Sequence, residues 1–216
     1  MLVLASNSPR RRQLMALGGW TFTLIPASVD ERPLPGEPPR EYVLRLAEDK
    51  ARTVAGRAPQ ATLVIAADTA VVDGADILGK PDDERQAEAM LRRLRGRSHQ
   101  VYTALAALRL TDGVLLTDWC QTEVPMRRYS DEEMAAYIAS GDPLDKAGAY
   151  AIQHEGFKPV EQLSGCFANV MGLPLCHLAR TMEKLGVPPE RDVPTTCRAA
   201  LNYDCMVYLQ VLTGEI

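Results

Sequence analysis

Hydroxyl and guanidinium side chains gather close to the start of the chain. Ser6 and Ser8 follow an apolar run at residues 2–5, and Pro9 then leads into three consecutive arginines at residues 10–12. Ser8 suits the N-cap of a helix and Pro9 its first turn, so the positive end of that helix would point at the two hydroxyls. Backbone N–H groups, hydroxyls and guanidiniums directed at one place can bind phosphate oxygens. An ordinary capped helix with solvated arginines has the same local pattern and is the alternative.

An acidic side chain and a lysine follow two further apolar segments. Asp68 and Thr69 come directly after residues 63–67, a run that is typical of a strand buried on both faces. A carboxylate at the carboxyl end of such a strand is where α/β sheets place ligand chemistry, although a turn or helix cap would also use it. Lys80 stands between a glycine and a proline. A solvated turn lysine is the alternative there.

A third polar cluster surrounds small residues at 141–153. It contains Asp142, Asp145 and Lys146 and ends on Gln153. Small side chains let a planar ring approach the backbone, and the Gln153 amide both donates and accepts hydrogen bonds, so it suits the edge of a base. Together the clusters supply what a nucleoside triphosphate needs: cations for its charge, carboxylates for a hard metal ion, and amide or hydroxyl groups for the base.

The elements that must bring these clusters together alternate between strands and helices. Apolar runs predict strands, and amphipathic segments bounded by caps or glycines predict helices, which is the pattern of an α/β fold. An Asp-Gly pair at 112–113 predicts a long hairpin, and the proline-rich stretch at 30–39 predicts a loop. Strands are expected at residues 2–5, 21–25, 63–67, 71–74 with 77–79, 101–110, 114–123 and 149–152, and helices at 9–18, 40–56, 82–95, 130–141 and 174–185.

Length and charge limit what the chain can be. It has 216 residues, of which 46% are hydrophobic and 24% charged, and this suits one domain with a sizeable core. A formal net charge of −4 argues against binding to nucleic acid polymers or anionic membranes. No apolar run is long enough to span a bilayer, and no signal-peptide pattern opens the chain, so we expect a cytoplasmic protein.

Cysteines and histidines form no recognisable metal or redox motif. The five cysteines are widely spaced without a C-x-x-C pair, so reduced thiols are expected. Cys197 and Cys205 leave open a disulfide or a metal pair close to the C-terminus. The histidines His99, His154 and His177 are scattered along the chain. Zinc and thiol redox chemistry are therefore not expected.

The polar clusters belong to five blocks that follow one another along the chain. The blocks are Ser6-x-Ser8-Pro9-Arg10-Arg11, Ala67-Asp68-Thr69 with Ile77-Leu78-Gly79-Lys80-Pro81, Gly96-x-x-His99-x-Val101-x-Thr103, Asp142-Pro143-x-Asp145-Lys146-Ala147-Gly148-Ala149-Tyr150-x-Ile152-Gln153, and Gly172-Leu173-Pro174. In order and spacing they resemble the Maf family of nucleoside triphosphate pyrophosphatases. The likeness covers residues 1–186 and leaves 187–216 as a C-terminal extension of unclear role.

The resemblance implies a fold and an activity. The fold is α/β, with a mixed twisted sheet, flanking helices and two lobes around a deep cleft, similar to inosine triphosphate pyrophosphatase, and the protein is expected to be a homodimer. The activity is hydrolysis of a nucleoside triphosphate to the monophosphate and pyrophosphate, and it depends on a divalent metal cation, Mg²⁺ or Mn²⁺.

The resemblance also implies roles for single residues. Asp68 matches the catalytic carboxylate, as proton acceptor for the attacking water or as metal ligand, and Glu31 matches an acidic position that shares the metal. Taken by itself, Lys50 would be a solvated helix lysine. The resemblance instead places Lys50 among the residues that line the phosphates in the family. These residues are Ser8, Arg11, Lys50 and Lys80.

Three residues indicate which branch of the family the chain resembles. The branch that prefers dTTP and UTP has an arginine after Ser-Pro, a threonine after the catalytic aspartate and a glutamine after Ala-Tyr-x-Ile, which here are Arg10, Thr69 and Gln153. Two features depart from the family pattern: residues 154–157 replace a glycine-led run, and the segment past residue 186 has no counterpart.

Two other functions stay open. The same cleft could sense a nucleotide as a regulator of cell division and septum formation without cleaving it. It could also clear modified or non-pyrimidine nucleotides, in which case Thr69 and Gln153 would face a different base. A pure sensor needs the cations but no water-activating carboxylate, and the chain has both Asp68 and Glu31.

Overall fold

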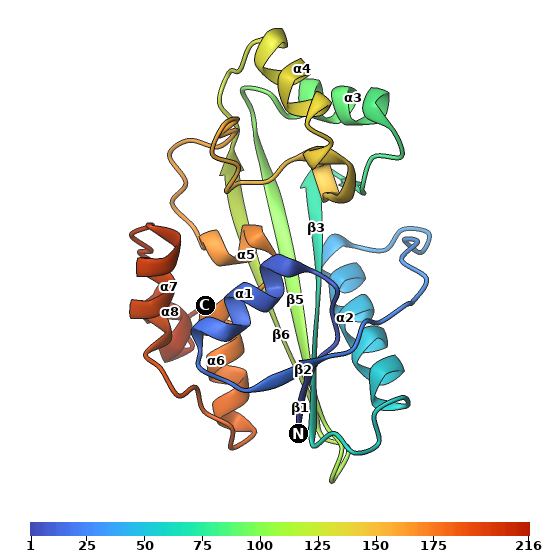
Figure 1. The fold of residues 1–216 in the computed structure, drawn as a ribbon, viewed down its shortest axis with the longest axis vertical. Helices are drawn as coiled ribbons and strands as arrows, with labels where there is room; N and C mark the ends of the chain where they lie inside the picture. The colour runs from blue at the N-terminus through green and yellow to red at the C-terminus, as the bar shows by residue number, and fades with distance from the viewer.

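The structure, a computed structural model, describes all residues 1–216 and is built on one mixed six-stranded sheet (Figure 1). The strands follow the order β2, β1, β3, β5, β6, and β4 pairs with β3 outside this path. β1 is parallel to β2 and β3, whereas β5 is antiparallel to β3 and β6. The α/β class with a mixed sheet is confirmed. The strands are β1 (Leu2–Leu4), β2 (Phe22–Leu24), β3 (Leu63–Asp73), β4 (Asp76–Leu78), β5 (Ser98–Arg109) and β6 (Leu115–Pro125).

Helices cover both faces of the sheet. α2 packs along β3 and β5, and Figure 1 shows α1 and α6 in front of the lower half of the sheet. None of the helices combines the length and the apolar character required to cross a lipid bilayer. The helices are α1 (Pro9–Leu17), α2 (Pro39–Ala55), α3 (Glu84–Leu94), α4 (Asp131–Ala139), α5 (Phe167–Met171), α6 (Leu175–Lys184), α7 (Val193–Leu201) and α8 (Tyr208–Thr213), with short 3₁₀ turns η1 (Asp142–Asp145) and η2 (Ala147–Ala149).

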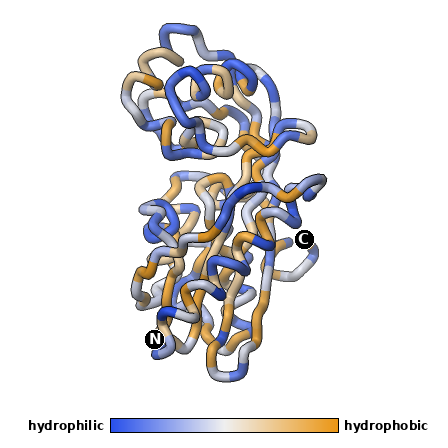
Figure 2. The backbone as a smooth tube through the Cα atoms, turned by 90° about the vertical axis from the view of Figure 1, so that its right-hand side faces the viewer, coloured by the Kyte–Doolittle hydropathy of each residue, from blue (hydrophilic) through white to orange (hydrophobic).

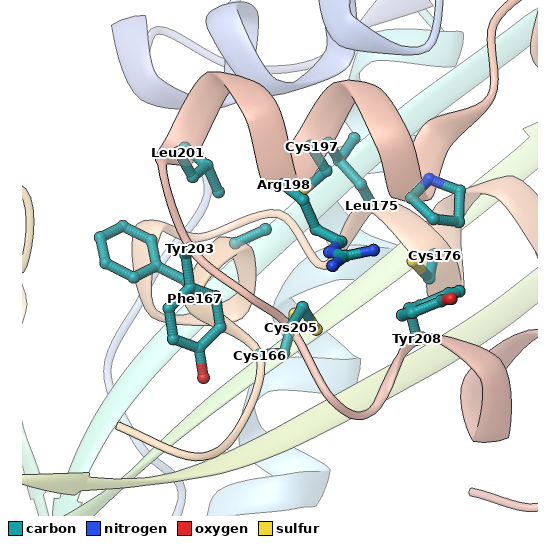
Figure 3. A pocket seen from close by; sticks show the side chains of 12 residues that line it. Cys166, Phe167, Leu175, Cys176, Cys197, Arg198, Leu201, Tyr203, Cys205 and Tyr208 are labelled. Atoms are coloured by element: carbon teal, nitrogen blue, oxygen red, sulfur yellow. The ribbon is translucent and has the colours of Figure 1, made fainter. Parts of the chain in front are cut away.

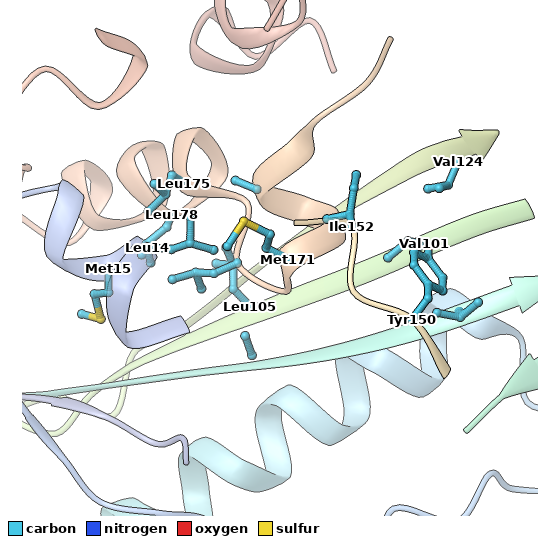
Figure 4. Close-up of a cluster of buried hydrophobic side chains, with 14 of the residues drawn as sticks. Leu14, Met15, Val101, Leu105, Val124, Tyr150, Ile152, Met171, Leu175 and Leu178 are labelled. Carbon is cyan, nitrogen blue, oxygen red and sulfur yellow. The ribbon is translucent and has the colours of Figure 1, made fainter. Parts of the chain in front are cut away.

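The alternation of side chains along β3 divides the apolar core in two. Val64 and Ala66 pack on the face covered by α2, in one cluster of buried residues. Ile65 and Ala67 point to the other face and belong to a larger cluster that includes side chains of α1, α5 and α6, part of which Figure 4 shows. Successive side chains of a strand point to opposite faces, so neighbouring residues of β3 reach different surroundings.

One edge of β3 is open in its middle. β5 pairs with β3 from Leu63 to Val72 along a single edge. The opposite edge is shared: β1 pairs with residues Leu63 to Ile65, and β4 pairs with Val71 to Asp73. A strand has only two hydrogen-bonding edges, so residues 66–70 have no neighbouring strand on this side. Asp68 and Thr69 lie in this gap.

The far halves of β3, β5 and β6 extend beyond β1 into a second lobe, seen at the top of Figures 1 and 2. This lobe contains α3, α4 and the two 3₁₀ turns, which contact one another. α4 begins at the capping box expected from the sequence: the Ser130 hydroxyl accepts from the Glu133 N–H, and the Glu133 carboxylate accepts from the Ser130 N–H. The rings of Tyr129, Tyr137 and Phe157 pack together inside the lobe.

The structure differs from the expected strands in two places. β3 continues through Asp68 to Asp73, because β5 provides hydrogen-bonding partners far beyond residue 67, so Asp68 lies in mid-strand and not at a strand end. The strand expected at residues 149–152 is absent. Gly148 and Ala149 have φ values of 68° and 60°, which turn the chain out of the extended conformation, and a Cβ on Gly148 would lie 2.8 Å from Val71 Cγ1.

The C-terminal extension packs against the helices that cover one face of the sheet. α7 contacts α1, α5 and α6, and α8 contacts α6. Val193 and Val211 of this segment belong to the larger core cluster. A small, mostly apolar cavity remains between the extension and the rest of the chain, and cysteine side chains from both sides lie in its wall (Figure 3). All five cysteines are free thiols, and four of them line this cavity: Cys166, Cys176, Cys197 and Cys205.

Truncation of a core leucine tests the packing of the sheet against its helices. Leu105 of β5 is fully buried in the larger cluster, and we expect Leu105→Ala to lower the free energy of unfolding by about 2–5 kcal/mol, since it removes buried apolar area and leaves a cavity. Leu209 of α8 is 60% exposed and serves as the matched control. Leu209→Ala should change the same free energy by less than about 0.5 kcal/mol in urea denaturation. Equal effects of the two substitutions would contradict the packing described.

Candidate active site

A cleft lies between the two lobes, with about 1810 Å³ of empty space that includes part of the open solvent. It opens at the gap in the edge of β3, and residues from both lobes line it. Every site residue predicted from the sequence lines this one cleft, so side chains far apart in the chain meet there: Ser8, Arg10, Arg11, Glu31, Lys50, Asp68, Thr69, Lys80 and Gln153.

A lysine between two carboxylates forms the centre of the cleft. Lys50 Nζ lies 2.6 Å from Asp68 Oδ1 and 2.6 Å from Glu31 Oε1. Lys50 and Asp68 are 7% and 6% exposed, whereas half of the Glu31 side chain is open to solvent. The interpretation of Lys50 as a solvated lysine is therefore wrong, because α2 packs on β3 and directs this side chain toward the sheet. The second carboxylate oxygen of Asp68 accepts no hydrogen bond from the protein.

Burial and charge act against each other on the two carboxyl groups. Burial raises the pKa of Asp68 above its ordinary value, and the charges of Lys50 and Arg11 offset only part of this effect. For Glu31, half-burial also acts to raise the pKa, but the hydrogen bond and charge of Lys50 outweigh it and leave the pKa lowered. The pKa values of the two carboxyl groups therefore shift in opposite directions, because burial dominates at Asp68 and the pairing with Lys50 dominates at Glu31.

Arg11 reaches the cleft from the opposite face of β3. Its Nε donates to the Gly172 carbonyl at 2.8 Å, and its Nη2 donates to Thr69 Oγ1 at 3.0 Å. The Thr69 hydroxyl also bonds Thr103 Oγ1 at 2.9 Å, and Thr103 donates to the Asn169 carbonyl at 3.0 Å. A guanidinium held at two of its nitrogens keeps one orientation, and its remaining N–H groups stay available for an anion.

The sequence offered no direct sign that Gly172 and Thr103 support this arginine. Gly172 has a φ of 106°, and a Cβ there would lie 3.2 Å from Thr69 Oγ1 and 3.4 Å from Arg11 Nε, so only glycine leaves this space free. A glycine directly after a helix and before Leu-Pro is typical of a left-handed helix C-cap, which would have predicted the conformation but not the contact.

Three further predicted residues stand around this centre. Ser8 is the N-cap of α1, as expected, and its hydroxyl accepts from the Arg11 N–H at 3.4 Å. Lys80 is exposed at the rim, on the segment that follows β4. Neither Arg10 nor Lys80 forms an ion pair or a side-chain hydrogen bond within the protein, so both cations are free to bind an anionic ligand.

Gln153 approaches the same cleft from the upper lobe. It lies in a turn in which the His154 N–H donates to the Ala151 carbonyl at 3.2 Å, and its exposed side chain makes no hydrogen bond to the protein. Lys146, also in the cleft wall, lies 3.0 Å from Asp142 Oδ1 and 2.6 Å from Asp145 Oδ1, so its single charge is shared between two carboxylates near the ligand space.

The donor atoms of the cleft suit a hard cation only in part. Glu31 and Asp68 supply carboxylate oxygens around one point, which are ligands that Mg²⁺ and Mn²⁺ prefer. No group of three or more histidine, cysteine, aspartate or glutamate side chains is placed to hold a metal ion. Mg²⁺ in phosphate-processing sites is commonly held by one or two carboxylates together with water and substrate phosphates, and the residues present fit such a site.

Comparison with known proteins identifies the family of this chain. A family model described as Maf-like protein matches residues 1–185. A dTTP/UTP pyrophosphatase of Anaeromyxobacter dehalogenans strain 2CP-1 is 51% identical over 189 residues, covering 87% of this chain and 95% of the relative. A dTTP/UTP pyrophosphatase of Myxococcus xanthus is 48% identical and covers 87% and 94%.

Among solved structures, the Ham1 protein of Staphylococcus aureus matches with a TM-score of 0.38 and 15% identity, over 70% of this chain and 86% of that chain. This likeness is too distant to carry an argument. The family assignment rests instead on the model that spans residues 1–185 and on relatives that align over most of their own length. The resemblance seen in the five sequence blocks is confirmed, and the chain belongs to the Maf family.

Proposed function

We propose that this protein hydrolyses nucleoside triphosphates, with dTTP and UTP as preferred substrates, to the monophosphate and pyrophosphate. The observation that carries the proposal is the meeting of a buried, lysine-paired carboxylate with free cations in one cleft. Such a cleft can neutralise a triphosphate and activate water at the same time. Relatives named dTTP/UTP pyrophosphatase support the same choice of substrate.

The proposed reaction is an in-line displacement at the α-phosphorus. A water molecule attacks, Asp68 accepts its proton, the new bond forms between the water oxygen and the α-phosphorus, and the bond from the α-phosphorus to the bridging oxygen breaks. Pyrophosphate leaves with the electron pair, and Arg11 and Lys80 hold its negative charge. The raised pKa of Asp68 favours this role, because a more basic carboxylate takes up the proton more readily.

A divalent cation, Mg²⁺ or Mn²⁺, fits this reaction, held by Glu31 and Asp68. When bound, it would neutralise charge on the phosphate oxygens and lower the pKa of a bound water. Lys50 holds both carboxylates in the same place, at 2.6 Å from each. Its charge also stabilises their ionised forms, which are the forms that bind a cation.

The remaining cleft residues divide between the phosphates and the base. Ser8, at the N-terminus of α1, and Lys50 belong to the phosphate side in this proposal, since the helix start adds N–H donors there. Gln153 would read the base edge, with Arg10 at the entrance to the cleft. Thr69 supports substrate binding through Arg11, because its hydroxyl already bonds that guanidinium.

We further propose a homodimer in the cytoplasm. A sensor of nucleotides in cell division, or an enzyme for modified nucleotides, would use the same cleft. The second carboxylate oxygen of Asp68, which accepts no hydrogen bond within the protein, favours hydrolysis over sensing, since a sensor gains nothing from a base in the ligand space. The choice between ordinary and modified bases lies with the surroundings of Gln153.

The products distinguish this reaction from other phosphatases. With Mg²⁺ or Mn²⁺ present, we expect release of pyrophosphate and the monophosphate from dTTP and UTP, because attack falls on the α-phosphorus. A panel of nucleoside triphosphates, scored for pyrophosphate against orthophosphate, provides the measurement. Orthophosphate as the sole product would place the cleavage at the γ-phosphorus and overturn the proposal.

Replacement of Asp68 tests its role as the base. Asp68→Asn keeps the shape of the side chain but removes its charge, so we expect kcat for dTTP to fall by roughly 10²- to 10⁴-fold. Asp73 lies on the same strand, is equally buried and pairs with Arg93 and Arg97 outside the cleft, which makes Asp73→Asn the matched control. Asp73→Asn should lower stability and leave kcat close to that of the wild type. Normal turnover by Asp68→Asn would remove Asp68 from the mechanism.

The pH dependence tests the pairing with Lys50. Ionised Asp68 is the active form, so kcat/KM should fall as the pH drops through its raised pKa, at a pH above the ordinary aspartate value. Lys50→Met removes a charge that lowers this pKa, so the acidic limb of the profile should move to higher pH. Steady-state rates for dTTP over a range of pH measure the shift. An acidic limb that stays in place, or moves to lower pH, would contradict the pairing.

A further inference from the structure

The turn that presents Gln153 to the cleft is held by a single tyrosine. Tyr137 of α4 accepts a hydrogen bond at its hydroxyl from the Ala151 N–H, at 3.0 Å. Its ring meets the ring of His154 edge to face, with centroids 4.7 Å apart. Ala151 and His154 are the first and last residues of the turn, closed by the bond between them. Tyr137 therefore contacts the turn at both ends.

Tyr137 is itself rigid. It is 3% exposed, and its ring stacks on Phe157 with centroids 4.3 Å apart. Its hydroxyl donates to Asp142 Oδ2 at 2.7 Å, which leaves the oxygen lone pair directed at the Ala151 N–H. Lys146 in turn holds Asp142 at 3.0 Å. Each group in this network has its partner, so the hydroxyl has one orientation.

The residues that depart from the family pattern take part in this arrangement. His154 and Phe157 replace part of the expected glycine-led run, and both pack against the Tyr137 ring. The His154 Nδ1 also accepts from the Phe157 N–H at 2.9 Å, which closes the segment on itself. Side chains in this run therefore restrain the chain directly after Gln153, where glycine would leave it free.

We propose that Tyr137 is a positioning residue for base recognition: it clamps the Ala151–His154 turn so that the Gln153 amide keeps one place in the cleft. The inference rests on the proposed function, and in particular on Gln153 as the group that reads the base. Tyr137 lines no part of the cleft and touches no ligand space. Its effect on the nucleotide would pass through the turn and through Asp142, which lines the cleft and accepts from the Tyr137 hydroxyl.

Binding of two ligands separates base recognition from phosphate recognition. One is a dTTP analogue that cannot be cleaved between the α- and β-phosphates, and the other is inorganic tripolyphosphate, which has no base. Tyr137→Phe keeps the ring but leaves the buried Ala151 N–H without a partner. We expect the Kd of the analogue to rise about five- to tenfold, the equivalent of one hydrogen bond, and the Kd of tripolyphosphate to stay within about twofold.

A double-variant cycle tests whether the effect passes through Gln153. If it does, Tyr137→Phe with Gln153→Ala should bind the analogue no more weakly than Gln153→Ala alone, since the turn then has nothing to position. His154→Ala loosens the other end of the turn and should weaken analogue binding in the same direction. Tyr129→Phe is the matched control: Tyr129 is equally buried and donates to the Leu91 carbonyl at 2.6 Å, so its loss should change neither Kd.

Three results would overturn the inference: wild-type affinity of Tyr137→Phe for the analogue, an equal loss for tripolyphosphate, or additive losses in the double variant. Thermal melting of Tyr137→Phe beside Tyr129→Phe measures what each hydroxyl contributes to stability. Binding of the analogue requires no turnover. A wild-type protein that binds the analogue but releases no pyrophosphate from dTTP would therefore contradict the proposed function. The Kd values of the variants would still decide the role of Tyr137. A wild-type protein that does not bind the analogue would overturn both.

Discussion

The open stretch in the edge of β3 is the constraint on which the site depends. β5 occupies one edge of this strand, whereas β1 and β4 share the other and leave residues 66–70 between them without a neighbour. A ligand can therefore approach a strand that lies in the middle of the sheet. A continuous neighbour would close the cleft and bury Asp68 without access to water, at a high cost in free energy for a charged carboxylate.

The alternation of side chains along β3 then separates two groups of charges. Asp68 points to the face of α2, where Lys50 pairs with it and with Glu31. Thr69 points to the other face, where Arg11 is held by its hydroxyl and by the Gly172 carbonyl. Asp68 and Thr69 are adjacent, so a carboxylate and the guanidinium held by Thr69 lie on opposite faces of the open stretch of β3. The same burial that raises the pKa of Asp68 places this carboxylate near Lys50 and Arg11, whose charges offset part of the rise.

The two lobes contribute different parts of the cleft. Arg11, Lys50 and Asp68 come from the first part of the sheet and its helices, whereas Gln153 comes from the lobe that contains α4. Under the proposed function, the packing behind the Ala151–His154 turn would act on the base and leave the phosphate contacts unchanged. That packing depends on aromatic contacts and on an ion-paired network around Asp142, which itself lines the cleft.

Local interactions were readable from the sequence, because their partners lie within a few positions. The Ser8 cap of α1, the Ser130 capping box and the hairpin at residues 112–113 are of this kind. The five motif blocks identified the family, and every site residue predicted from the sequence lines one cleft. Only the tertiary structure decided the rest. β3 runs past Asp68 because β5 pairs with it there, Lys50 is buried because α2 packs on the sheet, and Arg11 is fixed by a carbonyl 161 residues away. Such contacts depend on how distant segments pack, and no pattern of neighbouring residues specifies that.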